Sequence, residues 1–246
     1  MINADDFGQT LSCTKAIYEA YKLGLITDTT MVANGKAFEE AVDIIRNDPD
    51  FANHIGVHLI LTEDEPLTEG IASCPRLVSD GKFTKYFTSR SSNFKFLSSK
   101  EKKAIYDELS AQVDKLKDAG IILSHADSHH HVHTNFSICN IVFKVCKKNN
   151  IRRIRKRKNV LKYAFPKRAM YSFFNLLVKL NGFITSNYLG DIDDYENVKI
   201  PINSSVEVVV HPDYDKYGIL IDRAPKKYNS DGSYEVIGKK LIKFCK

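Results

Sequence analysis

The stretch IGVHLIL at residues 55–61 is a continuous apolar run that carries a single histidine, His58. Runs of this length that are rich in branched side chains are typical of strands buried inside a sheet. We therefore predict a buried strand over 55–61. An imidazole in that position costs free energy unless it is bonded, so His58 is either a satisfied core residue or a ligand.

Strand-like and amphipathic segments alternate on both sides of this run. Further extended segments are expected at 1–4, 29–33, 121–124, 151–155 and 205–210. Helices are expected at 12–23, with Ser12 as N-cap, and at 37–46, 100–119, 136–148 and 166–180. Residues 62–93, rich in Pro, Gly and Ser, are expected to form a long loop. The alternation favours parallel strands with crossover helices in one α/β domain covering residues 1–246.

The composition is that of an ordinary globular protein, with 43% hydrophobic and 27% charged residues. No run approaches the ~20 apolar residues of a membrane span. The first residues turn acidic at once and lack the basic and apolar regions of a signal peptide. Five scattered cysteines without a Cys-x-x-Cys pair fit reduced thiols. We expect a cytoplasmic protein without a membrane partner.

The positive charge is concentrated in one segment. The net charge is +6, and eight of the twelve residues in KKNNIRRIRKRK at 147–158 are Lys or Arg. Such a run could contact nucleic acid, or it could be the solvated end of a helix followed by a strand. No interleaved aromatic residues or binding motif accompany it. Nucleic acid is therefore not the expected partner and stays an alternative.

Imidazole is concentrated in a second segment. SHADSHHHVH at 124–133 holds five of the eight histidines, and neutral imidazole is the commonest metal ligand in proteins. The extended distance from residue 125 to 133 is about 26 Å, so these rings cannot all bind one ion. We expect one or two to be ligands and the others to orient ligands, contact substrate or lie on the surface.

Polar residues fall in or just beyond the expected strands, namely Asp5, Asp6, His58, His129 and His211. In barrel-type α/β enzymes the carboxyl ends of the strands carry the chemistry, so these groups are expected to converge there. Adjacent carboxylates repel unless a cation is present. The acid pair is therefore suited to ligating a metal with one carboxylate and moving protons with the other, unless it is a helix cap. The unperturbed pKa of histidine suits His211 to general acid catalysis, although strand ends also carry ordinary polar residues.

Four motifs together resemble a known family. NADDFG at 3–8, GVHL at 56–59, HADSHHHVH at 125–133 and VEVVVHP at 206–212 resemble the YdjC-like (ChbG) carbohydrate deacetylases, in order and over most of the chain. The resemblance implies a distorted (β/α) barrel, similar to the TIM barrel and to the fold of polysaccharide deacetylases. It also implies removal of N-acetyl groups from small sugars such as chitobiose with one divalent metal ion.

The resemblance assigns roles to matching positions: Asp6, His58 and His129 as metal ligands, Asp5 as the base and His211 as the general acid. One carboxylate and two imidazoles leave positions open for water and substrate, as a catalytic site requires. The resemblance favours magnesium, whereas two imidazoles favour zinc.

Two further residues are expected to support this site. The resemblance implies that Asp127 lies beside a metal ligand as an orienting group. One guanidinium of Arg152, Arg153 and Arg155 is expected to hold a substrate oxygen, and we take Arg152 as the first choice.

The expected partner is a small N-acetylated sugar, and assembly as a homodimer is left open. A metal-dependent phosphoesterase with the same ligands, a nucleic-acid-binding protein that uses residues 147–158, and a sugar-binding protein without turnover remain alternatives.

Overall fold

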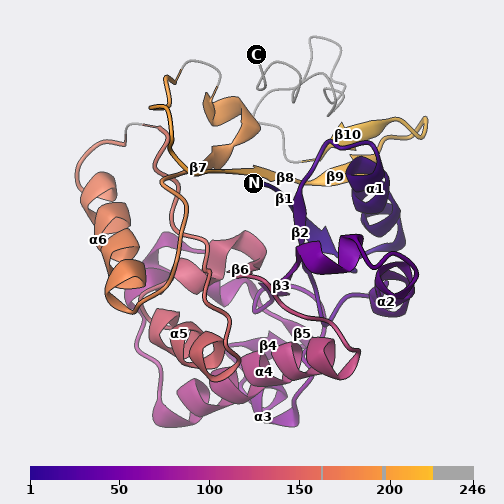
Figure 1. The fold of residues 1–246 in the computed structure, drawn as a ribbon. Helices are drawn as coiled ribbons and strands as arrows, with labels where there is room; N and C mark the ends of the chain where they lie inside the picture. The colour runs from indigo at the N-terminus through magenta and orange to yellow at the C-terminus, as the bar shows by residue number, and fades with distance from the viewer. Residues whose placement is uncertain (162, 196–197, 224–246) are drawn as a thin grey trace.

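A six-stranded parallel sheet forms the centre of the molecule (Figure 1), in the strand order β6-β3-β2-β1-β8-β7. The computed structural model describes residues 1–161, 163–195 and 198–223. All five neighbouring strand pairs are parallel. The strands are β1 Ile2–Phe7, β2 Asp28–Met31, β3 Ile55–Leu59, β6 Ala126–Ser128, β7 Tyr188–Asp191 and β8 Val206–Val210.

The helices lie around the outside of this sheet (Figure 1). They are α1 Leu11–Lys22, α2 Phe38–Asn47, α3 Glu69–Ala72, α4 Ser99–Asp118, α5 Cys139–Lys148 and α6 Lys167–Leu180. The curled sheet is a half-barrel, which confirms the expected distorted (β/α) barrel. Isolated parallel bridges from Ala126 to Ile154 and from Arg153 to Ile184 continue the curl beyond β6.

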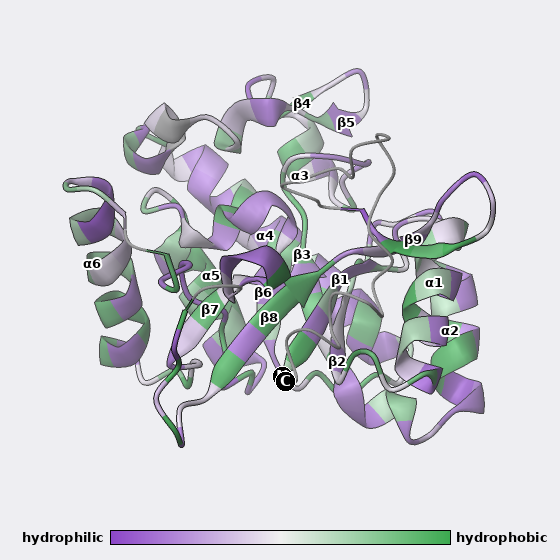
Figure 2. Cartoon of the chain, turned by 90° about the horizontal axis from the view of Figure 1, so that it is seen from above, coloured by the Kyte–Doolittle hydropathy of each residue, from purple (hydrophilic) through white to green (hydrophobic). Residues whose placement is uncertain are grey.

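The core is continuous between the sheet and the helices. All five residues of β3 are buried, as the apolar run predicts. Figure 2 shows apolar residues along most of β8, while α1 and α2 carry both polar and apolar residues. Among the described helices, none combines the length and the apolar content that crossing a membrane demands.

The segment before β6 differs from the expectation. The strand predicted at 121–124 instead lies at Ala126–Ser128. The chain does bond to β3 earlier, since Ser124 N donates to the Ile55 carbonyl and Val57 N to the His125 carbonyl. The side chain of His125 lies against Gly56, where a Cβ atom would come within 2.7 Å of the imidazole ring. Regular pairing between β3 and β6 therefore begins only after this contact, at Val57 and Ala126.

Three further expectations need correction. The first helix is capped by Thr10, whose side chain accepts a hydrogen bond from Cys13 N, and not by Ser12. Residues 151–155 form only isolated bridges. The expected loop 62–93 contains helix α3, the hairpin β4 Val78–Ser79 and β5 Lys82–Phe83, and 3₁₀ turns at Lys85–Phe87 and Arg90–Phe94.

Other short elements were not predicted by the sequence pattern. After β8 the chain forms an antiparallel hairpin, β9 Pro212–Tyr214 and β10 Leu220–Asp222. Further 3₁₀ turns lie at Phe51–His54, His129–Thr134 and Ile192–Tyr195.

Candidate metal centre and active site

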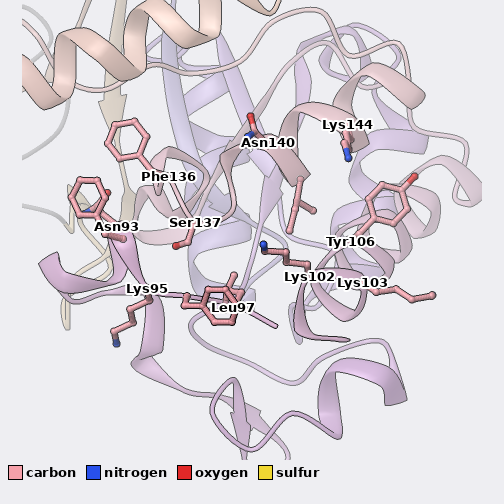
Figure 3. A pocket seen from close by; sticks show the side chains of 13 residues that line it. Asn93, Lys95, Leu97, Lys102, Lys103, Tyr106, Phe136, Ser137, Asn140 and Lys144 are labelled. Atoms are coloured by element: carbon pink, nitrogen blue, oxygen red, sulfur yellow. The ribbon is translucent and has the colours of Figure 1, made fainter. Parts of the chain in front are cut away.

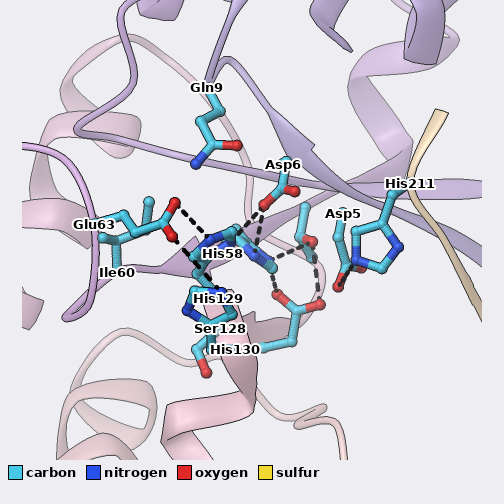
Figure 4. A network of polar contacts seen from close by, with 12 residues as sticks. Asp5, Asp6, Gln9, His58, Ile60, Glu63, Ser128, His129, His130 and His211 are labelled. Atoms are coloured by element: carbon cyan, nitrogen blue, oxygen red, sulfur yellow. Dashed lines mark hydrogen bonds and ion pairs between the residues drawn. The ribbon is translucent and has the colours of Figure 1, made fainter. Parts of the chain in front are cut away.

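Three side chains meet at the carboxyl end of the sheet (Figure 4). Asp6 lies near the end of β1, His58 near the end of β3, and His129 directly after β6. Asp6 Oδ1 lies 2.8 Å from His129 Nδ1 and 3.2 Å from His58 Nε2. One ligand atom from each residue lies within 4.8 Å of the other two. The structure thus brings together the three residues that the family resemblance assigned to a metal.

Strand β1 is irregular at the acid pair. Its register with β2 shifts between Ala4 and Phe7, and Asp6 has a φ of 75°, which is uncommon for a residue other than glycine. Neighbouring side chains of a regular strand point to opposite faces. The irregularity allows Asp5 and Asp6 to join one polar network with different partners (Figure 4).

The ring of His58 is oriented by a buried carboxylate. Asp127 lies beside His58 in the β3–β6 register, and its Oδ1 lies 2.6 Å from His58 Nδ1. Burial lowers the pKa of His58, but the charge and hydrogen bond of Asp127 outweigh this effect and raise it to about 10. Metal-binding histidines in proteins commonly donate their second ring nitrogen to a carboxylate in this way.

The donor set fits a divalent cation. With Nδ1 donating to Asp127, the other ring nitrogen of His58, Nε2, faces the Asp6 carboxylate. The raised pKa of His58 keeps a proton on this nitrogen in the metal-free site, and a bound cation would take the place of that proton. Within the described part of the chain, this buried nitrogen has no partner in hydrogen-bonding geometry. Two acceptors that face each other at this distance need a proton or a cation between them. Asp6, His58 and His129 are therefore a group that could hold a metal ion, and their chemistry does not select the metal.

The second oxygen of Asp6 is occupied. Arg223 NH2 lies 2.9 Å from Asp6 Oδ2, and the backbone nitrogen of Arg223 donates to the His211 carbonyl. Burial raises the pKa of Asp6, but the hydrogen bond from His129 and the charges of the His58 and His129 rings outweigh it and hold the pKa well below its usual range. Asp6 is therefore ionised and offers Oδ1 to the centre of the site.

Asp5 and His211 form the neighbouring part of the site. The Arg155 guanidinium donates two hydrogen bonds to Asp5, of 2.7 Å to Oδ2 and 2.8 Å to Oδ1. Burial raises the pKa of Asp5, but the charge and hydrogen bonds of Arg155 more than compensate and hold it far below its usual value. His211 Nε2 lies 3.8 Å from Asp5 Oδ2. This distance places the two expected proton-transfer groups next to each other.

Arg152 and Arg155 lie in different environments. Arg152 is exposed, whereas Arg155 is buried. Besides Asp5, the guanidinium of Arg155 contacts Asp127 Oδ2 and Glu207 Oε1, both at 2.6 Å. A substrate contact of Arg152 stays a prediction, whereas Arg155 is the arginine of this segment that contacts the site carboxylates. Arg155 acts on the carboxylates and not as an exposed substrate clamp.

Several residues of the site were missed in the sequence. Glu207 interrupts the apolar run VEVVV as His58 interrupts IGVHLIL, so the same signal was present for both. Asn3 donates to Asp5 Oδ1 and Thr30 to Asp127 Oδ2, at 2.8 and 3.1 Å. No local pattern marks Arg223, which reaches the site from the residue after β10.

The histidine segment divides into different roles. His125 donates to the side-chain oxygen of Asn3, and His133 lies between the Ser128 hydroxyl and the Arg155 carbonyl. Burial lowers the pKa of both rings to about 4. These two histidines are core residues that hold site residues in place. That only one or two rings of the segment bind an ion stays a prediction.

A cleft of about 610 Å³ opens beside the histidine segment, with His130, His131, Phe94, Arg157 and Tyr171 among its lining residues. A second, larger cavity of about 970 Å³ shares Phe94 with this cleft (Figure 3). Lysines at 102, 103 and 144 surround that second cavity. His130, which lines the smaller cleft, directly follows the candidate ligand His129 in the chain.

Much of the basic run 147–158 is used inside the molecule. Arg155 and Lys156 are buried, and Lys156 donates to the Asn187 carbonyl. Arg157 donates to the Thr134 carbonyl, and Lys158 pairs with Asp191. These contacts favour the interpretation of the run as structural over the nucleic-acid alternative.

Comparison with known proteins places this chain in a family. Residues 1–237 match the sequence model of the family described as YdjC-like protein. The chain belongs to the YdjC-like family. A carbohydrate deacetylase of Listeria monocytogenes serotype 4a is 30% identical over 220 residues, which cover 87% of this chain and 81% of the relative. A carbohydrate deacetylase of Oceanobacillus iheyensis is 36% identical over 146 residues, 59% of this chain and 60% of the relative.

A solved structure supports the fold of this YdjC-like chain. It is described as a candidate cellobiose-phosphate cleavage protein from Enterococcus faecalis V583. The two structures superimpose with a TM-score of 0.66 and 24% sequence identity, over 89% of this chain and 82% of the other. At this level of sequence identity, the structural similarity supports the fold and not a shared function.

Proposed function

We propose that this YdjC-like protein is a metal-dependent carbohydrate N-deacetylase. It would hydrolyse the amide of small N-acetylated sugars, such as chitooligosaccharides, to acetate and an amino sugar. The observation that carries the proposal is the meeting of Asp6, His58 and His129 beside the Asp5–His211 pair. The family and the carbohydrate deacetylases among its relatives support the same activity.

Each residue of the site has a place in amide hydrolysis. A divalent cation held by Asp6, His58 and His129 supplies Lewis-acid chemistry, which makes water more acidic and polarises a carbonyl. Asp5, kept ionised by Arg155, accepts the proton of the attacking water. His211 donates a proton to the sugar nitrogen as the C–N bond breaks. The close approach of Asp5 and His211 lets the two proton transfers occur on one substrate amide.

The metal and the sugar are the finer parts of this proposal. Magnesium is favoured by the family resemblance, and the two imidazole ligands also suit zinc. The cleft beside His130 and His131 offers room for a disaccharide. A cytoplasmic location stays a prediction.

An assay of free acetate tests the function. The purified protein is incubated with N-acetylated mono- and disaccharides, with chelator, and with chelator followed by excess magnesium or zinc. We expect acetate release that chelator abolishes and one of the two metals restores. Release unaffected by chelator would refute metal dependence. Hydrolysis of an aryl phosphate with no acetate from any sugar would favour the phosphoesterase instead.

A double substitution tests the ligand set. His58→Ala combined with His129→Ala should abolish metal binding in titration calorimetry, because only one of the three ligands remains. Retained binding with unchanged affinity would reject these two residues as ligands.

A further inference from the structure

The two ring nitrogens of His129 face two different carboxylates (Figure 4). Nδ1 lies 2.8 Å from Asp6 Oδ1, on the side of the candidate metal centre. Nε2 lies 3.2 Å from Glu63 Oε2, on the opposite side of the ring. If Nδ1 is the nitrogen offered to a cation, the ring proton must be on Nε2, where Glu63 accepts it. Glu63 lies four residues after β3 and was not among the residues singled out in the sequence.

His58 shows the same arrangement with its nitrogens exchanged. Its Nε2 faces Asp6 Oδ1, and its Nδ1 lies 2.6 Å from Asp127 Oδ1. Each candidate ligand ring thus offers one nitrogen to Asp6 and the other to a separate carboxylate. We propose that Glu63 is a positioning residue that fixes the tautomer and orientation of His129 for the metal, as Asp127 does for His58. This inference rests on the metal dependence of the proposed function.

The backbone around Glu63 is held on both sides, so its side chain starts from a fixed point. Thr62 is buried, and its hydroxyl lies 3.0 Å from His130 Nδ1. The Asp64 carbonyl accepts a 3.0 Å hydrogen bond from Phe83 N. The Glu65 carbonyl accepts one of 2.8 Å from the Asn34 side chain.

Solvent exposure sets the size of the effect. The Glu63 side chain is 41% exposed, whereas that of Asp127 is fully buried. Partners that orient metal ligands typically change metal affinity by roughly 10- to 100-fold when they are removed. Because water screens an exposed carboxylate, we expect Glu63 to fall at the lower end of this range.

Glu63 could instead be a ligand of a second ion. Glu63, His129 and His130 also form a group that could hold a metal, with His130 Nε2 3.8 Å from Glu63 Oε1. That arrangement would require the Nε2 of His129 to bind the second ion while Nδ1 serves the first. A protonated Nε2 that donates to Glu63 satisfies both His129 and Glu63 without a second cation, so the positioning role is the simpler account.

Titration calorimetry of the metal-free protein with magnesium and with zinc tests the proposal. We expect one ion per chain in the natural protein and in Glu63→Ala, with affinity about tenfold lower in the variant. Glu63→Gln should lose less, because its amide oxygen still accepts a hydrogen bond from Nε2. Glu65→Ala, which removes an exposed carboxylate two residues away, is the matched control and should leave the affinity unchanged.

The outcomes separate the positioning role from other roles. The thermal unfolding midpoint of Glu63→Ala in chelator should equal that of the natural protein, since a purely structural ion pair would lower it. Unchanged metal affinity in Glu63→Ala overturns the inference and leaves the deacetylase proposal standing. Two ions in the natural protein and one in the variant overturn it in favour of a second metal site. A natural protein that binds no ion overturns this inference together with the metal dependence.

Discussion

Arg155 has the most charged environment of any residue in the site. Its guanidinium is buried against three carboxylates, those of Asp5, Asp127 and Glu207. Burial lowers the pKa of Arg155, but these carboxylates outweigh it and raise the pKa well above its usual value. Removing one member of a buried charge cluster leaves the others uncompensated, which is more costly than losing an exposed ion pair.

Arg155→Met should therefore destabilise the fold by about 3–5 kcal/mol. The matched control is Arg152→Met, three residues earlier and exposed, which should change stability by about 0.5 kcal/mol or less. Urea unfolding of both variants in chelator measures the difference. Equal effects of the two substitutions would contradict the placement of Arg155 at the centre of the charge cluster.

Asp5 provides a second test at the same scale. Asp5→Asn removes the proposed base but leaves Asp6, His58 and His129 in place. We expect turnover to fall by about 10²- to 10⁴-fold, while the affinity for the metal stays close to that of the natural protein. Acetate release and titration calorimetry are measured on the same preparation. Unchanged deacetylation would reject Asp5 as the base.

Single residues were predictable where their chemistry stands out from the surrounding sequence. His58 is conspicuous in an apolar run, and the acid pair is conspicuous at a strand end. Arg155 was not selected from three nearby arginines, because the face that each one presents depends on pairing with distant segments. Glu63 was missed because its importance comes only from the position of His129.

At the scale of elements, the contact between β3 and the segment before β6 is tight. A methyl group on Gly56 would come within 2.7 Å of the His125 ring. His125 in turn bonds to Asn3, which donates to Asp5. The packing of two strands is thus connected through two side chains to the proposed base.

Gly56→Ala should destabilise the protein by about 1–3 kcal/mol, because the added methyl group overpacks this contact. It should also lower turnover. Displacement of His125 breaks its hydrogen bond to Asn3, and Asn3 in turn donates to the proposed base Asp5. Gly70→Ala in α3 is the matched control, with no atom within 4 Å of the added methyl group, and should be neutral or slightly stabilising. Thermal unfolding and acetate release measure both effects. A Gly56→Ala protein with natural stability would show that the His125 ring moves aside freely.

Helices were easier to predict than strands. The helix expected at 100–119 is observed at Ser99–Asp118 with Ser98 and Glu101 forming a capping box, because periodicity and caps are local signals. The short strand β7 and the hairpin of β9 and β10 were missed. Such elements are defined by pairing with strands far away in the chain, and the local sequence does not specify which strands these are.

At the scale of the whole molecule, the candidate ligands come from three distant parts of the chain. Asp6, His58 and His129 meet only when β1, β3 and the turn after β6 are in place. A cation that binds this arrangement has no comparable site in the unfolded chain. Binding free energy should therefore add to the stability of the folded state.

The metal should raise the thermal unfolding midpoint. At a concentration 100 times its dissociation constant, a ligand of the folded state adds about 2.7 kcal/mol, which corresponds to roughly 5–10 °C for a chain of this size. The double variant with His58→Ala and His129→Ala should show no such shift. Calorimetric scans with chelator and with increasing metal measure it. An equal shift in the double variant would place the stabilising ion elsewhere.

The overall architecture could be anticipated only in part. The alternation of strands and helices indicates parallel strands, and the motifs at four strand ends resemble a family of distorted barrels. The strand order, with β1 between β2 and β8, places the acid pair next to His211. That order follows from contacts over about 200 residues of sequence separation, which no local pattern encodes.

Asp127 joins the two halves of the site. One of its oxygens contacts His58 and the other contacts Arg155, which holds Asp5. Substitutions at His58 and at Arg155 should consequently be non-additive, since both change the same carboxylate. An attempt to engineer the preference for one metal through Asp127 would also alter the proton acceptor. His129, whose two ring nitrogens face Asp6 and Glu63, offers a way to change the metal preference without altering Asp127.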